Sequence, residues 1–220
     1  GNMYHDETDI TIKNRGLPYV FTRSYNSGPG RVDQDGPLGF GWTHSYNMSL
    51  RSNDYGKCPN CTSAQASEND NNIPSSISYI DERGGEHTYI LNADGAGTRS
   101  VAENPPGEFE SLQFNTPASG QHILSFRNGV KYVFEEVGSP NMLTTKDETA
   151  RLKYIEDVYN NRLNLTYDGS GRLSAVVDNL GISGRTGLIF TYSGSSTRIQ
   201  TVRDWTNRTW TFAYDGRGNL

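Results

Sequence analysis

Two cysteines form the motif in this sequence that most resembles a reactive site. Cys58 and Cys61 lie in Cys-Pro-Asn-Cys, a spacing that fits a local disulfide, two free thiols, or part of a metal or redox centre. A structural zinc site takes four ligands, and the chain has only these two cysteines. A thioredoxin-like motif needs a βαβ setting, which the surrounding residues do not show. A disulfide between Cys58 and Cys61 is favoured if the protein is secreted, and free thiols are the main alternative.

His44 is the histidine with the most suggestive neighbours. It is followed by Ser45, and Asp9 could complete a Ser/His/Asp set. Such a set is defined by its geometry and not by sequence order, and these residue types are common enough to occur together by chance. The sequence therefore gives no positive evidence for nucleophilic catalysis.

Aspartates recur at turn positions, in Asp-x-x-Gly and Asp-x-x-Asn elements. Calcium prefers carboxylates that are clustered on a turn, but these elements match neither the EF-hand loop nor the glycine-rich nonapeptide. We expect the aspartates to form turns, and we expect the chain to bind no metal and no cofactor.

The composition favours many short strands. The 220 residues include 13 Tyr, 8 Phe, 3 Trp and 24 Gly, which suits pleated strands joined by tight turns. The net charge is −5 and the basic residues are scattered, whereas nucleic-acid-binding modules show a basic footprint. No apolar run approaches the roughly 20 residues that span a bilayer. We therefore expect an all-β chain that neither binds nucleic acid nor spans a membrane.

The last third of the sequence repeats itself. Residues 157–173, 178–194 and 204–220 each contain a turn, an arginine, alternating apolar residues and a strand-ending tyrosine. Two copies then continue with Asp-Gly, whereas the middle copy has Ser193 in that place. The residues that define the repeat are Arg162, Tyr167, Asp168, Arg185, Tyr192, Arg208, Tyr214 and Asp215.

Alternation within each copy predicts a meander of antiparallel hairpins. Apolar residues two apart, as in Trp210, Phe212 and Tyr214, share one face of a strand, and we expect that face to pack into the core. Residues 152–159 also have helical spacing, but the turn signal at 157–161 favours a strand. Two further hairpins are predicted upstream, with turns at 81–85 and at Asn128-Gly129.

These signals divide the chain into four segments of one continuous β unit. They are an N-terminal segment (1–51), a mobile polar loop that contains the two cysteines (52–76), irregular hairpins (77–150) and the repeats (151–220). We expect the chain to be a fragment of a longer one, because neither end looks native.

The N-terminal and C-terminal segments resemble a known family. Residues 17–27 (LPYVFTRSYNS) and 36–46 (GPLGFGWTHSY) resemble the start of RHS-repeat proteins. Residues 167–173 (YDGSGRL) and 214–220 (YDGRGNL) resemble the YD repeats of the same family. The two signatures occur in the expected order, and their combination is specific.

The resemblance implies an antiparallel sheet that spirals into a hollow shell around a C-terminal toxin or other cargo. It implies a structural role for His44, with toxin activity and self-cleavage in regions outside these residues. We therefore expect a non-catalytic shell segment of a secreted or cell-surface bacterial protein, whose partners are the rest of the shell and its enclosed domain. The alternative is a surface-exposed module that binds carbohydrate or a cell-surface protein through Tyr and Trp rings. Exposure of these rings would distinguish the two.

Overall fold

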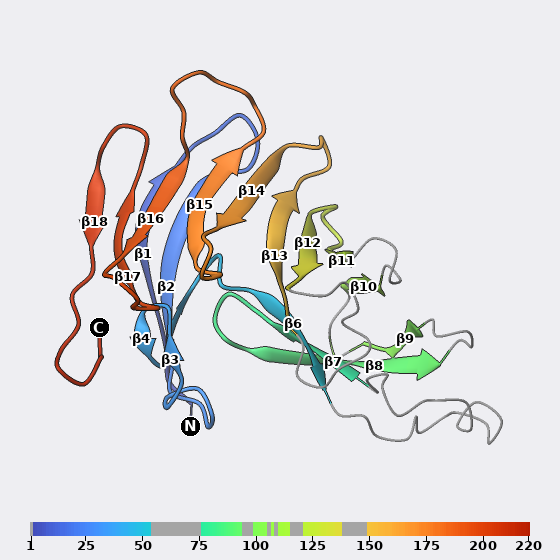
Figure 1. Ribbon diagram of the computed structural model, residues 1–220. Coiled ribbons are helices and arrows are strands. Elements are labelled where there is room, and N and C mark those ends of the chain that lie inside the picture. Colours follow the sequence, from blue (N-terminus) through green and yellow to red (C-terminus); the bar gives the residue numbers. More distant parts are fainter. Residues whose placement is uncertain are drawn as a thin grey trace. The chain divides into compact units, whose positions relative to one another are not determined.

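The computed structural model describes residues 2–53, 76–93, 99–104, 107, 110–114, 121–137 and 149–220. Within these residues the chain forms strands and turns without a helix, and the paired strands are antiparallel, which confirms the all-β prediction (Figure 1). The described part also has no helix long and apolar enough to cross a membrane. Cys58 and Cys61 lie outside the described residues, so the disulfide stays a prediction.

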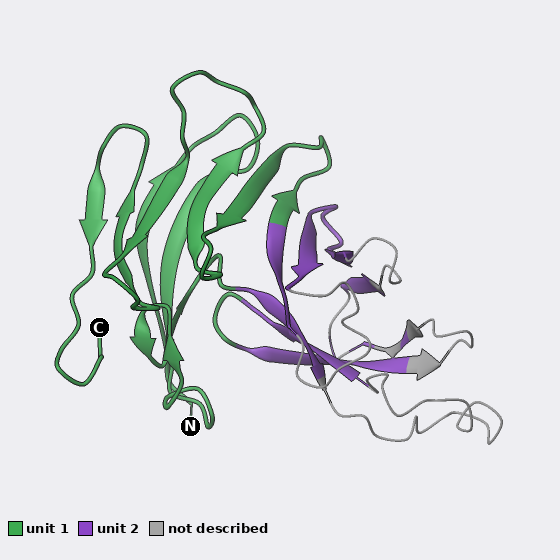
Figure 2. Ribbon diagram, viewed as in Figure 1, with its two compact units in different colours: residues 1–47, 82–84, 154–220 green, residues 48–81, 85–153 purple. Residues whose placement is uncertain are grey.

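The chain folds as two compact units. Unit 1 contains residues 1–47, 82–84 and 154–220, and unit 2 contains residues 48–81 and 85–153 (Figure 2). The four segments expected from the sequence stay predictions, and most of the polar loop at 52–76 lies outside the described residues.

The first sheet of unit 1 is formed by N-terminal residues and is called the N-terminal sheet below. Its strands are β1 (Tyr4–Ile12), β2 (Tyr19–Asn26) and β5 (Trp42–His44), in the order β1-β2-β5. A small pair, β3 (Asp35–Gly36) and β4 (Gly39–Phe40), lies between β2 and β5 in sequence. Tyr19 and Phe21, two residues apart on β2, are fully buried, as expected for residues that share the face of a strand that packs into a core.

The second sheet of unit 1 contains the sequence repeats and is called the hairpin sheet. The end of β13 (Thr149–Glu156) is followed by β14 (Arg162–Tyr167), β15 (Leu173–Asp178), β16 (Leu188–Tyr192), β17 (Ile199–Arg203) and β18 (Thr209–Thr211). Each strand pairs with the next along the chain, which is the predicted meander. β13 is a strand, as predicted, and it ends at the turn that begins at Asp157.

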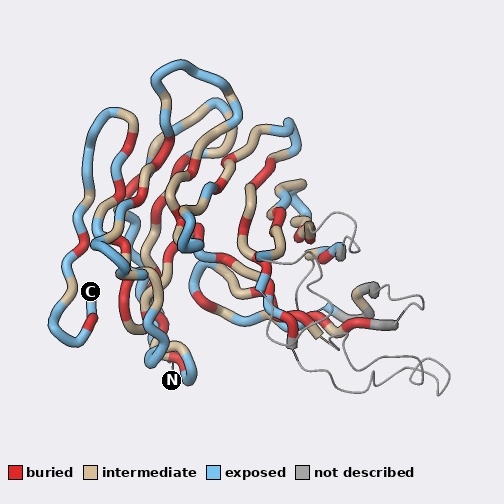
Figure 3. The backbone as a smooth tube through the Cα atoms, viewed as in Figure 1, coloured by how far each residue is buried: buried red, intermediate tan, exposed pale blue. Residues whose placement is uncertain are grey.

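The two sheets of unit 1 pack face to face. The Phe21 ring lies 5.8 Å from Phe190 and 5.9 Å from Phe212, and Tyr19 lies 5.3 Å from Trp205, measured between ring centroids. Figure 3 shows the buried positions along the facing strands. The apolar core of unit 1 includes Ile10, Tyr19, Phe21, Leu38, Tyr46, Leu163, Leu165, Val176, Leu188, Phe190, Ile199, Val202 and Phe212.

Unit 2 is built from shorter hairpins. Its strands are β6 (Ser49–Asn53), β7 (Ser76–Ile80), β8 (Glu86–Ala93), β9 (Arg99–Glu103), β10 (Ser111–Phe114), β11 (Gln121–Ser125), β12 (Lys131–Glu136) and the start of β13. β6 and β12 both pair with β13, and the two predicted hairpins are confirmed as β7-β8 and β11-β12. Its core includes Leu50, Ile77, Tyr79, Tyr89, Leu91, Leu124, Val133, Phe134, Ala150 and Leu152.

Candidate functional site: the aspartate turns and the covered hairpin sheet

Four turns of unit 1 share one backbone geometry. They begin at Asp157, Asp168, Asp204 and Asp215. In each, the aspartate N–H donates to the carbonyl four residues later, at 2.8 to 3.0 Å, and the N–H three residues later donates to the aspartate carbonyl. This is the three-residue hairpin loop in which a type I turn is followed by a left-handed residue.

The left-handed position explains the repeated Gly or Asn. It is occupied by Asn160, Gly171, Asn207 and Gly218, with φ of 61°, 78°, 67° and 89° respectively. Most side chains are strained at such φ values, whereas Gly adopts them freely and Asn tolerates them. The sequence pattern Asp-x-x-Gly/Asn is therefore required by this turn.

The carboxylate of each turn aspartate also accepts hydrogen bonds from later residues of the same turn. The Oδ1 atom of Asp168 accepts hydrogen bonds from the N–H groups of Ser170 and Arg172, and its Oδ2 atom accepts one from Arg172 Nε at 2.8 Å. Asp204 has the same arrangement with Thr206 and Arg208. In the other two turns, Asn161 and Asn219 replace the arginine.

These donors favour the ionised aspartates. The hydrogen bond from the Arg172 backbone holds the pKa of Asp168 below its ordinary value. Burial raises the pKa of Asp204, but hydrogen bonds from Thr206 and Arg208 outweigh it and the net pKa is lowered. The aspartates are therefore saturated with donors from their own turns, and this is the turn-forming role expected from the sequence.

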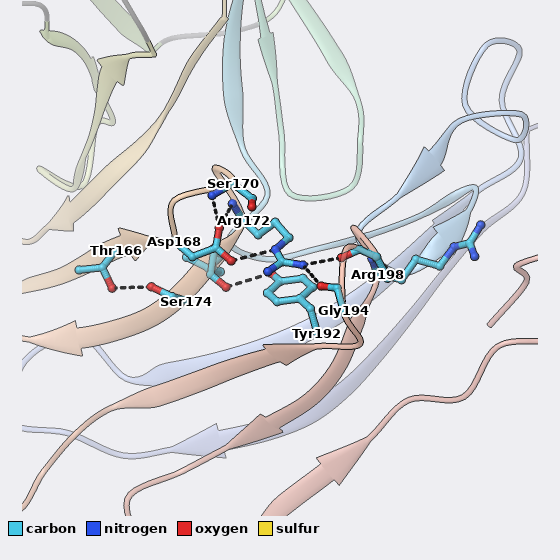
Figure 4. A network of polar contacts seen from close by, with 10 residues as sticks. Thr166, Asp168, Ser170, Arg172, Ser174, Tyr192, Gly194 and Arg198 are labelled. Atoms are coloured by element: carbon cyan, nitrogen blue, oxygen red, sulfur yellow. Dashed lines mark hydrogen bonds and ion pairs between the residues drawn. The ribbon is translucent and has the colours of Figure 1, made fainter.

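Arg172 connects one hairpin to the next. Its Nη1 atom donates to the carbonyls of Gly194 and Ser196, at 2.8 and 2.9 Å, while its Nε atom stays on Asp168. The guanidinium lies 4.6 Å from the centroid of the Tyr192 ring, and the Tyr192 hydroxyl donates to the Leu173 carbonyl at 2.9 Å (Figure 4). We call this arrangement an arginine clamp.

A second clamp occurs one hairpin further on. Arg198 lies 5.7 Å from the Tyr214 ring, and the Tyr214 hydroxyl donates to the Ile199 carbonyl at 2.6 Å. Arg198 also makes two hydrogen bonds to Asp35, at 2.9 and 2.7 Å. Burial raises the pKa of both tyrosines to about 12, so each hydroxyl keeps the proton that it donates.

The structure places the three arginines that help to define the sequence repeat, Arg162, Arg185 and Arg208, differently. Arg208 belongs to the Asp204 turn and lies over Trp210, whereas Arg162 binds Glu156 and lies over Tyr154. Arg185 donates to Asn14 Oδ1 and lies over Trp205. The same place in the sequence repeat therefore does not make these arginines structurally equivalent.

Sequence reasoning missed the clamp arginines. Arg172 and Arg198 each precede the first residue of a strand, in Gly-Arg-Leu and Thr-Arg-Ile, and that shared position was the available signal. The tyrosines of the two clamps, Tyr192 and Tyr214, were identified from the repeat. Tyr192 ends β16, as expected, whereas Tyr214 lies three residues beyond the end of β18 at Thr211. Tyr167 ends β14, opposite Leu173 and at a register shift.

The residues that could have formed a Ser/His/Asp set have separate partners. His44 is buried and accepts a hydrogen bond at Nδ1 from the Tyr46 N–H, at 3.2 Å. Burial lowers the pKa of His44 to about 3, so its ring is neutral. The Ser45 hydroxyl donates to the Val20 carbonyl, and Asp9 is held by Arg23.

The N-terminal sheet covers the aromatic face of the hairpin sheet. Phe190 and Phe212 are only 5% and 7% exposed, against Phe21 of β2. Trp210 and Tyr214 are half-buried. Within the described residues no three His, Cys, Asp or Glu side chains gather as metal ligands. Phe190 and Phe212 therefore belong to the core, whereas the rings of Trp210 and Tyr214 stay partly exposed.

The comparisons with known proteins give a partial match. The family described as a domain of unknown function (DUF6531) matches residues 1–89, which is less than half of the chain. No curated protein matches the sequence. The fold is similar to the N-terminal domain of the effector protein SpvB from Salmonella typhimurium strain LT2, with 14% sequence identity and a TM-score of 0.43. That similarity covers 89% of this chain and 71% of the SpvB domain.

Proposed function

We propose that this chain is a non-catalytic segment of a secreted bacterial RHS-repeat protein and forms part of a β-shell that encloses a C-terminal toxin or cargo. The observation that carries the proposal is the repeated aspartate turn, which places β14 beside β13, β15 beside β14 and β18 beside β17. A unit that contacts mainly its neighbours can be added many times, and this is how repeat proteins build extended walls.

The clamps support the same role. Arg172 ties the β14-β15 turn to carbonyls between β16 and β17, and Arg198 ties that connection to Asp35. Their donors are used on the chain's own backbone and carboxylates. Such contacts stabilise the order of neighbouring hairpins without presenting a reactive group.

The N-terminal sheet fits the first part of a wall. It buries Phe190 and Phe212, so one face of these hairpins is covered by residues that precede them in the chain. The RHS-like residues 17–27 and 36–46 contribute to this cover and lie within the region matched by the DUF6531 family.

The alternative role as a binding module has less support. A glycan platform needs several coplanar and solvated rings. Phe190 and Phe212 are instead buried against Phe21, and the rings of Tyr192 and Tyr214 lie against arginine side chains.

The proposal can be tested by protease protection. The longer polypeptide, with the residues that follow this segment in the gene, would be digested beside its C-terminal domain produced alone. We expect the C-terminal domain to resist digestion only in the longer polypeptide, and Phe21→Ala to remove that protection. The exposed residue Tyr159 gives the control variant Tyr159→Ala. Equal digestion of the C-terminal domain in all forms would overturn the proposal.

A further inference from the structure

The connection between β15 and β16 departs from the aspartate turn. It runs from residue 179 to residue 187, and three glycines in it, at 181, 184 and 187, have positive φ. Within this described stretch, a single backbone hydrogen bond joins two residues of the connection: the Arg185 N–H donates to the Ile182 carbonyl. The longer connection lies against the segment that joins β1 to β2, because Arg185 Nη1 donates to Asn14 Oδ1 at 2.7 Å.

A pocket of about 300 Å³ opens between these two connections. Its lining residues are Lys13, Asn14, Arg15, Ile182 and Arg185. All five belong to unit 1. Three of the five carry a positive charge and none carries a negative charge, in a chain whose net charge is −5.

Arg185 is held in place by neutral and aromatic groups. Besides its bond to Asn14, its guanidinium lies 4.8 Å from the centroid of the Trp205 ring. These contacts leave 23% of the side chain exposed. An arginine that is already fixed loses little conformational entropy when it binds a ligand.

The carboxylate nearest to Arg185, that of Asp178, accepts hydrogen bonds from other groups. Asp178 accepts hydrogen bonds from Asn14 Nδ2 at 3.1 Å, the Tyr19 hydroxyl at 2.9 Å and the Leu180 N–H at 3.0 Å. Its closest approach to Arg185 is longer, at 3.7 Å. Asp178 therefore compensates the charge of Arg185 only in part.

Lys13 and Arg15 are not compensated at all within the described part of the chain. Both are exposed, and neither side chain forms an ion pair or hydrogen bond with a described residue. Elsewhere in unit 1, arginines 23, 172, 198 and 208 are paired with carboxylates. Exposed Arg203 and Arg217 also form no ion pair within the described residues. Lys13 and Arg15 differ from them because they line a pocket together with the fixed guanidinium of Arg185, and this grouping of positive charge favours an anionic partner.

We propose that this pocket binds a phosphate group. A tetrahedral oxyanion accepts several charge-assisted hydrogen bonds at once, which matches the guanidinium of Arg185 together with the side chains of Lys13 and Arg15. The group can belong to a small phosphorylated molecule or to a phospholipid headgroup. The inference goes beyond the proposed shell function and does not depend on it.

Titration of the intact chain tests the proposal with two probes. Inorganic phosphate would be followed by the tryptophan fluorescence of the chain, because Trp205 lies beside Arg185. Vesicles of phosphatidylglycerol would be compared with vesicles of phosphatidylcholine in a sedimentation assay. We expect saturable binding of phosphate or of the anionic vesicles. Binding of phosphate indicates a small ligand, and binding of anionic vesicles alone indicates a headgroup.

A charge-matched pair of double variants separates the pocket from general electrostatics. Lys13→Gln/Arg15→Gln should weaken binding at least about tenfold, the equivalent of about 1.4 kcal/mol. Arg203→Gln/Arg217→Gln removes the same charge from exposed positions outside the pocket and should leave the affinity unchanged. Equal weakening in both double variants, or no saturable binding of either probe to the unmodified chain, would overturn the proposal.

Discussion

Tyr19 and Asp178 exchange two hydrogen bonds across 159 residues of sequence. The Tyr19 hydroxyl donates to Asp178 Oδ2 at 2.9 Å, and the Asp178 N–H donates to the same hydroxyl oxygen at 2.7 Å. Burial raises the pKa of Tyr19 well above its ordinary value, so the hydroxyl remains a donor. This pair joins the start of β2 to the end of β15, and so links the N-terminal sheet to the hairpin sheet.

Removing this hydroxyl should destabilise unit 1. Tyr19→Phe keeps the ring against Trp205 but leaves the Asp178 N–H without its acceptor, which should lower the free energy of unfolding by about 1–3 kcal/mol. Urea denaturation followed by Trp fluorescence measures the change. Tyr159→Phe makes the same change on an exposed ring and should have no effect. Identical midpoints for the two variants would contradict the assignment.

The packing between the two sheets should depend strongly on Phe21. This ring is fully buried against Phe190, Phe212 and His44, so Phe21→Ala should lower the free energy of unfolding by about 3–5 kcal/mol. Trp210→Ala should have a smaller effect, because Trp210 is only half-buried. Chemical denaturation gives both values. A larger loss at Trp210 than at Phe21 would show that the sheets do not pack as described.

The repeats were predictable because their signals are local. An aspartate, a Gly or Asn three residues later and alternating apolar residues define both a turn and the strand that follows it. For the same reason the assignment of residues 152–156 to a strand was correct. The turn that begins at Asp157 ends this segment directly after β13, so a helix over residues 152–159 could not form.

Pairings between distant residues could not be predicted in the same way. Asn14 and Arg185, or Asp35 and Arg198, are brought together by the packing of two sheets, and nothing in their local sequence specifies the partner. The division into two compact units has the same origin, since residues 82–84 belong to unit 1 although residues 81 and 85 belong to unit 2.

The turn aspartates predict a loss of stability in acid. The pKa of Asp204 is lower in the folded chain than its ordinary value of about 3.9. Ionised Asp204 therefore adds its full share to the free energy of unfolding above about pH 3.9, and this share is lost as the pH falls through the folded pKa. Asp168, Asp157 and Asp215 are shifted in the same direction. The free energy of unfolding should therefore decrease below about pH 4.

Asp204→Asn should flatten this pH dependence. The amide retains an oxygen that can accept from the turn N–H groups but has no charge to titrate against Arg208. Urea unfolding at a series of pH values should show a shallower decline for Asp204→Asn than for the unmodified chain. Asp33→Asn, at an exposed position, serves as the control. Parallel curves for Asp204→Asn and the unmodified chain would refute the assigned role.

The arginine clamp predicts a specific local effect. Arg172→Lys keeps the charge but cannot hold Asp168, Gly194 and Ser196 at once, so the segment between β16 and β17 should open more often. Hydrogen exchange should become faster at residues 193–197 and stay unchanged in unit 2. The control variant Arg203→Lys makes the same change at an exposed arginine of β17 and should leave hydrogen exchange at residues 193–197 unaltered. Unchanged exchange in Arg172→Lys would mean that the clamp does not stabilise this connection.

The outer edge of β18 predicts self-association. Among the described strands β18 ends the order of the hairpin sheet and pairs only with β17. The Phe212 N–H points toward β17, where it donates to the Gln200 carbonyl, so by alternation the polar backbone groups of Thr211 point away from it. An open edge of this kind can pair with a strand of another chain.

Light scattering should therefore show a molecular mass that rises with protein concentration. Thr211→Pro removes the outward N–H and should reduce the rise, whereas Thr211→Val keeps it and should not. A strict monomer at all concentrations, or equal association of the two variants, would show that this edge does not mediate contact between chains.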